Sequence, residues 1–440
     1  MKKIYSKAFK TLSKMKHHAQ SIDDALIGGL SYKLKAGASY VTNRRSVTYF
    51  AQGGNSYSSQ GVKVMKFHLT GDQWLDPSTF HVMLQVNNRD AAKPLKSAHW
   101  NPAVMFSRMR LIAGGSVLED ISDANRLSLM LDALTSSDER TLRHTQGFSI
   151  LRDASEAFDW ADTIPANDSR IVMFKPLFGL FKQEKLIPLR YCPLQIELEL
   201  VSTMSDAFVH NDGTHVANWD VTDIQCKLDL LTLDNSLDNE YASHLLSGKS
   251  LPINFSTWNH TNQSTGGDKN FSAHISRSLT RLKAVFITLQ NPYPNAEHSL
   301  NKHVNQFWHP MITRGDGKYG FSAEHQVQLH IGSKLYPEYP IRGMAEAMSQ
   351  LLKAVGNHFY IPEWKYRGYN YIIGIDTEKI SGAGFTGINT KNGELLTINF
   401  KNCENPDDGP DGNTIPGRVF AALHYDAVLN IKSEGVEVLE

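Results

Sequence analysis

A glycine-rich segment in the last quarter of the chain matches a phosphate-binding pattern. Gly382, Gly384 and Gly387 have the GxGxxG spacing that can cradle a dinucleotide pyrophosphate. Such a site needs a helix directly after the glycines, because the first amide groups of that helix bind the phosphate. The segment 388–393 that follows has the polar sequence INTKNG, which predicts a turn. We therefore interpret the glycines as part of a flexible loop that holds no cofactor.

Three histidines in a predicted long loop raise the question of a metal site. His298, His303 and His309 have spacings that fit neither HExxH nor a pair one helical turn apart, and no carboxylate-rich motif accompanies them. His325 and His330 are an odd number of residues apart on a predicted strand, so they would point to opposite faces. These spacings favour surface histidines, and we predict no metal site.

Acidic residues and nucleophiles provide no stronger signal for catalysis. Asp407, Asp408 and Asp411 stand in a Gly- and Pro-containing segment without the order of an EF-hand loop, which indicates a solvated turn. The chain has no GxSxG elbow, P-loop or kinase signature. Two carboxylates for glycoside hydrolysis could still meet through folding, since such a pair leaves no local trace. We predict that the protein is not an enzyme and has no cofactor or small-molecule substrate.

Length and charge restrict the class of protein. A chain of 440 residues is long enough for two domains. Its 45 basic and 45 acidic residues give a net charge of zero, which disfavours a protein that wraps nucleic acid and favours neutral protein partners. The three cysteines form no CxxC pair, and the sequence has neither a long apolar run nor a signal peptide. We expect reduced thiols and synthesis in a reducing cytosol.

Short segments of alternating polarity dominate from residue 44 onward and predict an all-β protein. In 80–86, every second residue is apolar, which is typical of a strand with one buried face. The clearest predicted strands are 62–69, 80–86, 106–113, 194–201, 224–231, 282–289, 327–331, 395–400 and 419–423. Long connections separate several of them, as expected where loops make contacts outside a sandwich.

Two predicted helices reveal an internal repeat. Segment 122–134 begins with a Ser-Asp pair that could cap a helix, and both 122–134 and 343–355 carry an apolar stripe that we expect to face a core. Each helix follows a strand and a Gly-Ser-x-Leu segment, at 115–118 and at 332–335. The repeat predicts two similar sandwiches in tandem.

We place the domain boundaries around this repeat. The prediction is a basic N-terminal arm at 1–43, a first sandwich at 44–233, a linker at 234–250 and a second sandwich at 251–440. The arm has no acidic residue among its first twenty, and it could contact a genome, a lipid layer or a neighbouring subunit, or be a solvated tail. Its lysines are our candidates for an interior contact: Lys2, Lys3, Lys7, Lys10, Lys14 and Lys16.

Several segments, in order, resemble the double jelly-roll major capsid proteins of polinton-like viruses, virophages and related eukaryotic double-stranded DNA viruses. The resemblance covers most of the chain from Arg44, and the order of the segments carries it rather than any single motif. These segments are RRSVTYFAQGG at 44–54, LTGDQWLDPST at 69–79, PLFGLF at 176–181, LIPL at 186–189, LQIELEL at 194–200, SLTRLKAVFITL at 278–289, YPEYPIR at 336–342, HYDAVLNI at 424–431 and GVEVL at 435–439.

The resemblance implies a fold and a function. It implies two tandem eight-stranded jelly rolls with one short helix in each, and a homotrimer of near-sixfold outline that tiles an icosahedral shell in the virion. The implied partners are copies of the chain, neighbouring capsomers, penton and minor capsid proteins, and a membrane or genome reached by the arm. The loop tryptophans Trp258, Trp308 and Trp364 are candidate interface anchors, with a core role left open. The alternative is a β-sandwich carbohydrate-binding or carbohydrate-active protein whose tryptophans stack on sugars.

Overall fold

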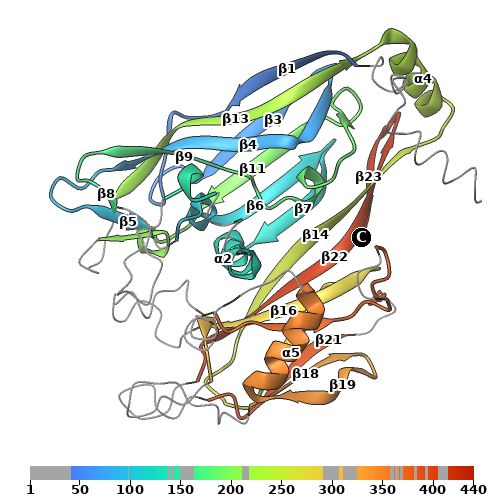
Figure 1. The fold of residues 1–440 in the computed structure, drawn as a ribbon. Coiled ribbons are helices and arrows are strands. Elements are labelled where there is room, and N and C mark those ends of the chain that lie inside the picture. Colours follow the sequence, from blue (N-terminus) through green and yellow to red (C-terminus); the bar gives the residue numbers. More distant parts are fainter. Residues whose placement is uncertain are drawn as a thin grey trace, which may run out of the picture.

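The computed structural model places two β-sandwiches side by side, one built from the first half of the chain and one from the second (Figure 1). Residues 1–40 of the predicted arm, with its six lysines, and Trp364 lie outside the described residues, whereas residues 41–43 belong to the first strand. The structure describes residues 41–97, 99–136, 139, 143–148, 163–210, 218–290, 307–310, 325–356, 361, 366, 370–380, 384–391, 395–404 and 415–440.

The first sandwich consists of two main antiparallel sheets. The first sheet has the order β1 (Val41–Phe50), β13 (Trp219–Leu233), β4 (Trp74–Asn88) and β9 (Ser169–Phe174). The second sheet has the order β3 (Val64–Leu69), β11 (Leu194–Leu200), β6 (Phe106–Ala113) and β7 (Ser116–Ser122). Two short strands, β2 (Ser56–Tyr57) and β10 (Ile187–Pro188), pair with β13 and β4 of the first sheet. A separate small sheet has the order β12 (Phe208–His210), β5 (Leu95–Ser97) and β8 (Thr163–Ile164).

The second sandwich repeats both strand orders. Its first sheet has the order β14 (Leu251–Ser264), β22 (Arg418–Lys432), β16 (Leu282–Gln290) and β20 (Ile373–Asp376). Its second sheet has the order β15 (Phe271–Ile275), β21 (Leu396–Lys401), β18 (Gln326–Ile331) and β19 (Lys334–Arg342). Two further strands join the first of these sheets: β17 (Phe307–Trp308) and β23 (Gly435–Leu439).

The repeat seen in the sequence is a β-hairpin followed by a helix. β6, β7 and helix α2 (Ala124–Leu134) in the first sandwich correspond to β18, β19 and helix α5 (Gly343–Val355) in the second. Gly115 and Gly332 turn the two hairpins at φ angles of 82° and 58°, which a residue with a Cβ rarely adopts. The prediction of an all-β fold of two tandem sandwiches is confirmed.

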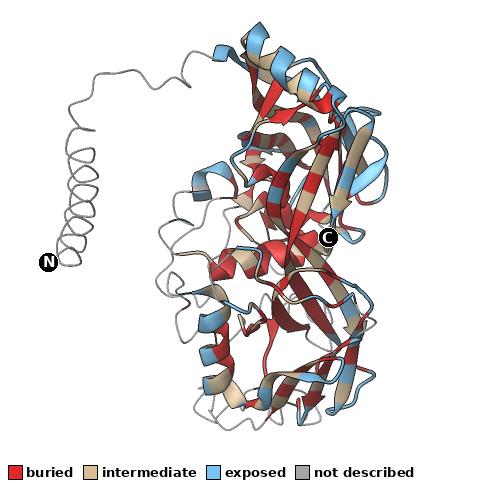
Figure 2. Cartoon of the chain, turned by 90° about the vertical axis from the view of Figure 1, so that its right-hand side faces the viewer, coloured by how far each residue is buried: buried red, intermediate tan, exposed pale blue. Residues whose placement is uncertain are grey.

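The alternation of side chains explains how the strands close a core. Phe80, Val82, Leu84 and Val86 of β4 are fully buried, as predicted, and the ring of Phe80 stacks on that of Phe181 at 4.4 Å between ring centroids. Buried residues run between the sheets of both sandwiches, whereas exposed residues follow the outer faces (Figure 2). In the described part of the chain no helix is long and apolar enough to cross a membrane.

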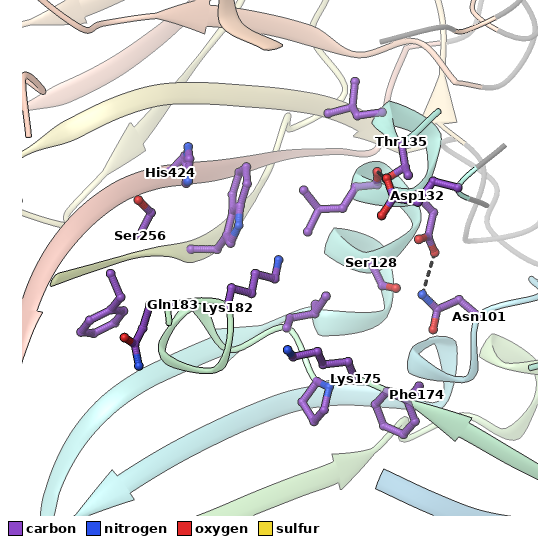
Figure 3. Close-up of a pocket in the computed structure, with 18 of the residues that line it drawn as sticks. Asn101, Ser128, Asp132, Thr135, Phe174, Lys175, Lys182, Gln183, Ser256 and His424 are labelled. Carbon is purple, nitrogen blue, oxygen red and sulfur yellow. Dashed lines mark hydrogen bonds between the residues drawn. The ribbon is translucent and has the colours of Figure 1, made fainter. Parts of the chain in front are cut away.

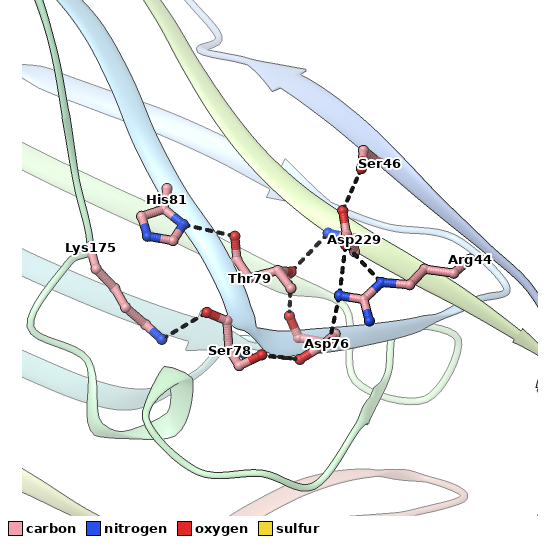
Figure 4. Close-up of polar contacts among 8 residues, drawn as sticks. All are labelled: Arg44, Ser46, Asp76, Ser78, Thr79, His81, Lys175 and Asp229. Carbon is pink, nitrogen blue, oxygen red and sulfur yellow. Dashed lines mark hydrogen bonds and ion pairs between the residues drawn. The ribbon is translucent and has the colours of Figure 1, made fainter. Parts of the chain in front are cut away.

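A polar cluster explains why β4 continues beyond its predicted start at residue 80. The pairing of β4 with β13 shifts register between Asp76 and His81, at a bulge containing Asp76, Ser78 and Thr79 (Figure 4). The backbone N–H of Asp229 donates to Thr79 Oγ1 at 2.9 Å, and the Arg44 guanidinium bridges Asp229 at 2.8 Å and Asp76 at 3.3 Å. Hydrogen bonds from Ser46 and Arg44 lower the pKa of Asp229. The polar segment before residue 80 therefore belongs to the strand as a β-bulge that these hydrogen bonds and ion pairs stabilise.

The predicted linker contains a helix that the sequence analysis missed. Helix α4 (Asn235–Leu246) begins after Asp234, whose carboxylate accepts a hydrogen bond from the Ser236 N–H at 3.1 Å. The rings of Tyr241 and Trp74 lie 5.0 Å apart, so the helix covers the end of the first sandwich. Other short helical turns are η2 (Pro102–Met105), η3 (His144–Gln146), η4 (Gly179–Phe181) and η5 (Met204–Asp206).

The two predicted helices need one correction each. Asp123 precedes α2 as expected, but its φ of 46° is left-handed and its side chain makes no cap hydrogen bond. In α5 the predicted apolar stripe does not face the core as a whole. Leu351 is fully buried, whereas Leu352 is 41% exposed and leaves an apolar surface on the helix.

Candidate functional site: the junction between the two sandwiches

The two sandwiches meet through β7, α2 and η4 of the first and the β14-β22-β16 sheet of the second. β7 lies against β14, and the Ser122 hydroxyl donates to the His260 carbonyl at 2.6 Å. Side chains that the sequence analysis did not select form the polar part of this contact: Glu119, Asp123 and Arg126.

Glu119 joins three segments at the centre of the junction. Its carboxylate accepts hydrogen bonds from the N–H groups of Gly179 at 2.7 Å and Leu180 at 2.9 Å, and from the Thr257 hydroxyl on β14. Only 1% of Glu119 is exposed. Burial raises the pKa of this carboxyl although the three donors lower it. A buried carboxylate with this many donors fixes the position of η4 and β14 relative to β7.

Gly179 lets the sandwiches approach closely. A Cβ atom at this position would lie 1.9 Å from the Ser256 carbonyl oxygen, which belongs to the other sandwich. No van der Waals contact is that short, so any side chain here would push β14 away. The glycine in the segment PLFGLF therefore has a packing role at the junction.

Asp123 contacts the second sandwich instead of capping its own helix. Its Oδ2 atom accepts a hydrogen bond from Asn262 Nδ2 at 2.7 Å and lies 3.2 Å from His260 Nδ1. Burial acts to raise the pKa of Asp123, but the contacts with His260 and Asn262 outweigh it, and the pKa is lowered. The left-handed backbone at Asp123 aims the carboxylate across the junction.

Arg126 extends from α2 into the core of the second sandwich. A terminal nitrogen donates to the Leu289 carbonyl at 2.8 Å, and the guanidinium lies 4.1 Å from the ring centroid of Phe420 and 4.8 Å from that of Phe307. Burial lowers the pKa of Arg126 to about 9. The rings and carbonyl offset part of the desolvation of this charge.

A cavity of about 1180 Å³ opens beside these contacts (Figure 3). Lys175 and Lys182 enter it from the first sandwich, while Trp258 and His424 line it from the second. The Lys182 side chain is exposed to solvent on the side that lines the cavity. Protein atoms still surround its amine closely enough that burial lowers the pKa of this group. Burial, with the charges of Lys283 and Lys182, lowers the pKa of His424 to about 3, so its imidazole is neutral.

Ser256, His424 and Asp426 all line this cavity, which calls for a test of a catalytic triad. In a triad, histidine bridges serine and aspartate. Here the Ser256 hydroxyl donates directly to Asp426 at 2.5 Å, and the His424 ring stacks on Trp258 at 4.4 Å between centroids. No hydrogen bond joins His424 to either residue in the described part of the chain. The cluster therefore holds strands together and lacks the order needed for nucleophilic attack.

Of the candidate interface and interior residues named from sequence, the structure describes only two tryptophans. Trp258 on β14 and Trp308 on β17 are only 8% and 4% exposed and belong to the core, the alternative left open for them. A contact with a partner stays a prediction for these two and for Trp364, which lies outside the described residues together with the six lysines of the arm: Lys2, Lys3, Lys7, Lys10, Lys14 and Lys16.

The glycine-rich segment, the histidines and the acidic segment named from sequence form no cofactor or metal site within the described residues. After Gly387, Ile388 forms a β-bridge with Leu282, so no helix follows that glycine in the described segment. The predicted surface position is wrong for His309 and His325, which are buried, and burial lowers the pKa of His309 to about 4. His298 and His303 lie outside the described residues, as do Asp407, Asp408 and Asp411. The described residues contain no group of three or more His, Cys, Asp or Glu side chains arranged to hold a metal.

No family model and no curated protein matches the sequence. The fold, in contrast, is similar to solved structures of viral capsid proteins. VP54 of PBCV-1 has a TM-score of 0.63 at 12% identity, and the match covers 93% of this chain and 98% of VP54. A chain of the Sputnik virophage has a TM-score of 0.60 at 10% identity, over 93% of this chain and 90% of that one.

The Faustovirus major capsid protein has a TM-score of 0.56 at 8% identity, and the match covers 91% of this chain and 92% of that one. At such low identity these likenesses show the fold. They extend over both sandwiches, so the fold is a double jelly roll.

Proposed function

We propose that this chain is the major capsid protein of a double-stranded DNA virus, and that three copies form a pseudo-hexameric capsomer that tiles an icosahedral shell. The observation that carries the proposal is the match of both sandwiches, in order, to VP54 over 93% of this chain and 98% of that one. A chain with two similar sandwiches supplies six in a trimer, which gives the outline needed for hexagonal packing.

The two ends of the first sandwich differ in a way that supports an orientation in the shell. Val41 pairs with Leu233, so the arm enters β1 at the end where α4 begins. At the opposite end β4 ends and β9 and β13 begin, because Asn87 and Asn88 of β4 pair with Ser169 and Trp219, so the connections that join these strands start or finish there (Figure 1). We propose that the loop-bearing end faces outward and the lysine arm faces the capsid interior. If protease trimmed the arm from intact particles without disrupting them, it would have to face outward instead.

The proposed partners follow from this role. The chain would contact its own copies, neighbouring capsomers, penton proteins and minor capsid proteins, and its arm would contact a genome or an internal membrane. Zero net charge supports close packing of many copies, since it avoids long-range repulsion between them. The chain would be made in the host-cell cytosol and reside in the virion.

No observation favours the carbohydrate alternative. The alternative depends on loop tryptophans that could stack on sugars, and the rings of Trp258 and Trp308 are buried. The Ser256 cluster in the cavity also lacks a catalytic order.

Light scattering on the purified full-length chain tests the proposal. We expect a mass of three chains, and electron cryo-microscopy of assembled material should show shells tiled by near-hexagonal capsomers. A chain that stays monomeric at high concentration would overturn the proposal.

A further inference from the structure

Each sandwich has a strand and helix that could contact another sandwich, but within the described residues only the pair in the first sandwich, β7 and α2, is covered by a neighbouring sandwich. β7 lies against β14 inside the chain, and Leu118, Glu119 and Ile121 of β7 are 1% exposed or less. The strand in the same place of the second sandwich is β19, where Glu338 and Tyr339 are exposed. The described part of the chain therefore contains one closed junction and one open copy of its first half.

The helices differ in the same way. Nine residues of α2 are buried, because the helix lies between its own sandwich and the next one. Only Ala347, Gln350 and Leu351 of α5 are buried, and within the described residues the helix packs mainly on β20 and β19. Leu352 at 41% and Tyr339 at 52% exposure add an apolar element to this open side, which we name the β19–α5 surface (Glu338, Tyr339 and Leu352).

The sheet edge that receives β7 also has an uncovered equivalent, in the first sandwich. β14 receives β7 and has five buried residues in its first ten. β1 has the same place in the first sandwich, and no residue in it is buried. Phe50 at the end of β1 is 65% exposed. We name the outer side of β1, with Phe50, the β1 surface.

We propose that the β19–α5 surface of one copy docks on the β1 surface of a second copy, as β7 and α2 lie on β14 and its neighbouring strands within the chain. The inference rests on the proposed function and identifies the surfaces that build the trimer. The contact is head-to-tail, because the two surfaces differ, and such contacts close into a ring when the rotation between copies allows it.

An acidic side chain lies near the same place on both surfaces. Glu119 stands five residues before the first residue of α2 and Glu338 five before the first residue of α5, although the two strands differ in length, because Glu119 follows Gly115 by four residues and Glu338 follows Gly332 by six. The Glu119 carboxylate reaches Thr257 on β14 across the internal junction. Glu338 is exposed, and its carboxylate has no hydrogen bond or ion pair within the described residues. A second copy would give this exposed carboxylate a partner, as β14 gives one to Glu119 inside the chain.

The test uses two variants of the full-length chain that each damage one surface. Tyr339→Asp with Leu352→Asp places charges on the β19–α5 surface, and Phe50→Asp places one on the β1 surface. Leu246→Asp is the matched control, because Leu246 is 81% exposed on α4 and belongs to neither surface. We expect both variants to sediment as monomers at concentrations where the wild type and the control are trimers, with unchanged circular dichroism.

Mixing the two variants tests the head-to-tail geometry. Each variant keeps one intact surface, so an equimolar mixture should form dimers with one junction that cannot close into a ring. If the variants trimerise like the wild type, the docking is wrong and the proposed function still stands. This holds even if these trimers fail to assemble into shells, because the surfaces would then belong to another contact in the capsid. A monomeric wild type would overturn both.

Discussion

The first and second sandwiches share their strand orders but not their surroundings. In the first, β7 and α2 are closed by the β14 sheet, and charged groups such as Glu119 and Arg126 are buried with partners from the other sandwich. In the second, β19 and α5 present Tyr339 and Leu352 to solvent. The same architecture therefore forms a closed junction in one sandwich and an open surface in the other, and the side chains and neighbours decide which.

The largest effect is expected where the sandwiches come closest. Gly179→Ala would place a Cβ atom against the backbone of Ser256, which cannot move aside as a side chain could. We expect a loss of about 4 kcal/mol in the free energy of unfolding, above the usual cost of overpacking. Chemical denaturation measures it. Gly384→Ala is the control, since no atom lies within 4 Å of its added Cβ, and equal losses in the two variants would contradict a role for Gly179 in close approach.

A pair of leucines compares the two helices directly. Leu129 of α2 is 7% exposed, and Leu352 of α5 is 41% exposed. We expect Leu129→Ala to lower the free energy of unfolding of the chain by about 3 kcal/mol and Leu352→Ala by about 0.5 kcal/mol or less. Thermal unfolding of the two variants at low protein concentration, where monomers dominate, measures the difference. Similar losses would mean that the open side of α5 is covered within the monomer.

Local patterns predicted the elements of the fold better than their extent. Strand β6 and helix α5 have the predicted bounds, because a regular alternation and a glycine stop mark them. Strand β4 begins six residues before its predicted start, since the polar segment at Asp76 becomes a strand only through Asp229 on β13. Helix α4 was missed because its few apolar residues pack on Trp74, a neighbour that sequence spacing does not reveal.

The junction was the least predictable part. Glu119 and Arg126 look like surface residues of a strand and a helix, and they are buried only because the second sandwich covers them. The repeated Gly-Ser-x-Leu unit predicted two sandwiches but not which copy is covered. That difference arises from tertiary contacts such as the one between Glu119 and Thr257, which join residues 138 apart in sequence.

A buried and an exposed glutamate, Glu119 and Glu338, provide a smaller and more specific test. Glu119→Gln replaces an acceptor of three hydrogen bonds with an amide whose NH₂ group would face donors, so we expect a loss of about 2 kcal/mol in the free energy of unfolding. Glu338→Gln at the open position should change monomer stability by less than about 0.5 kcal/mol. Urea denaturation of both variants gives the comparison. A null result for Glu119→Gln would show that the internal junction does not depend on this carboxylate.

The smallest effect concerns pH at the side of the second sandwich that faces the cavity. Burial lowers the pKa of His424 from 6.5 to about 3, so the unfolded chain binds a proton that the folded chain rejects. The stability that this neutral imidazole contributes is present above about pH 6.5 and is lost as the pH falls toward 3. Between about pH 7 and pH 5 we expect a loss of about 1–2 kcal/mol in the free energy of unfolding from this residue.

Chemical unfolding measured across this pH range should show a shallower dependence of the free energy of unfolding on pH for His424→Gln than for the wild type. His274→Gln on β15, at an exposed histidine, should keep the slope of the wild type. If His424→Gln also kept it, the acid sensitivity would arise elsewhere, and the closed junction would owe none of its pH dependence to the imidazole stacked on Trp258.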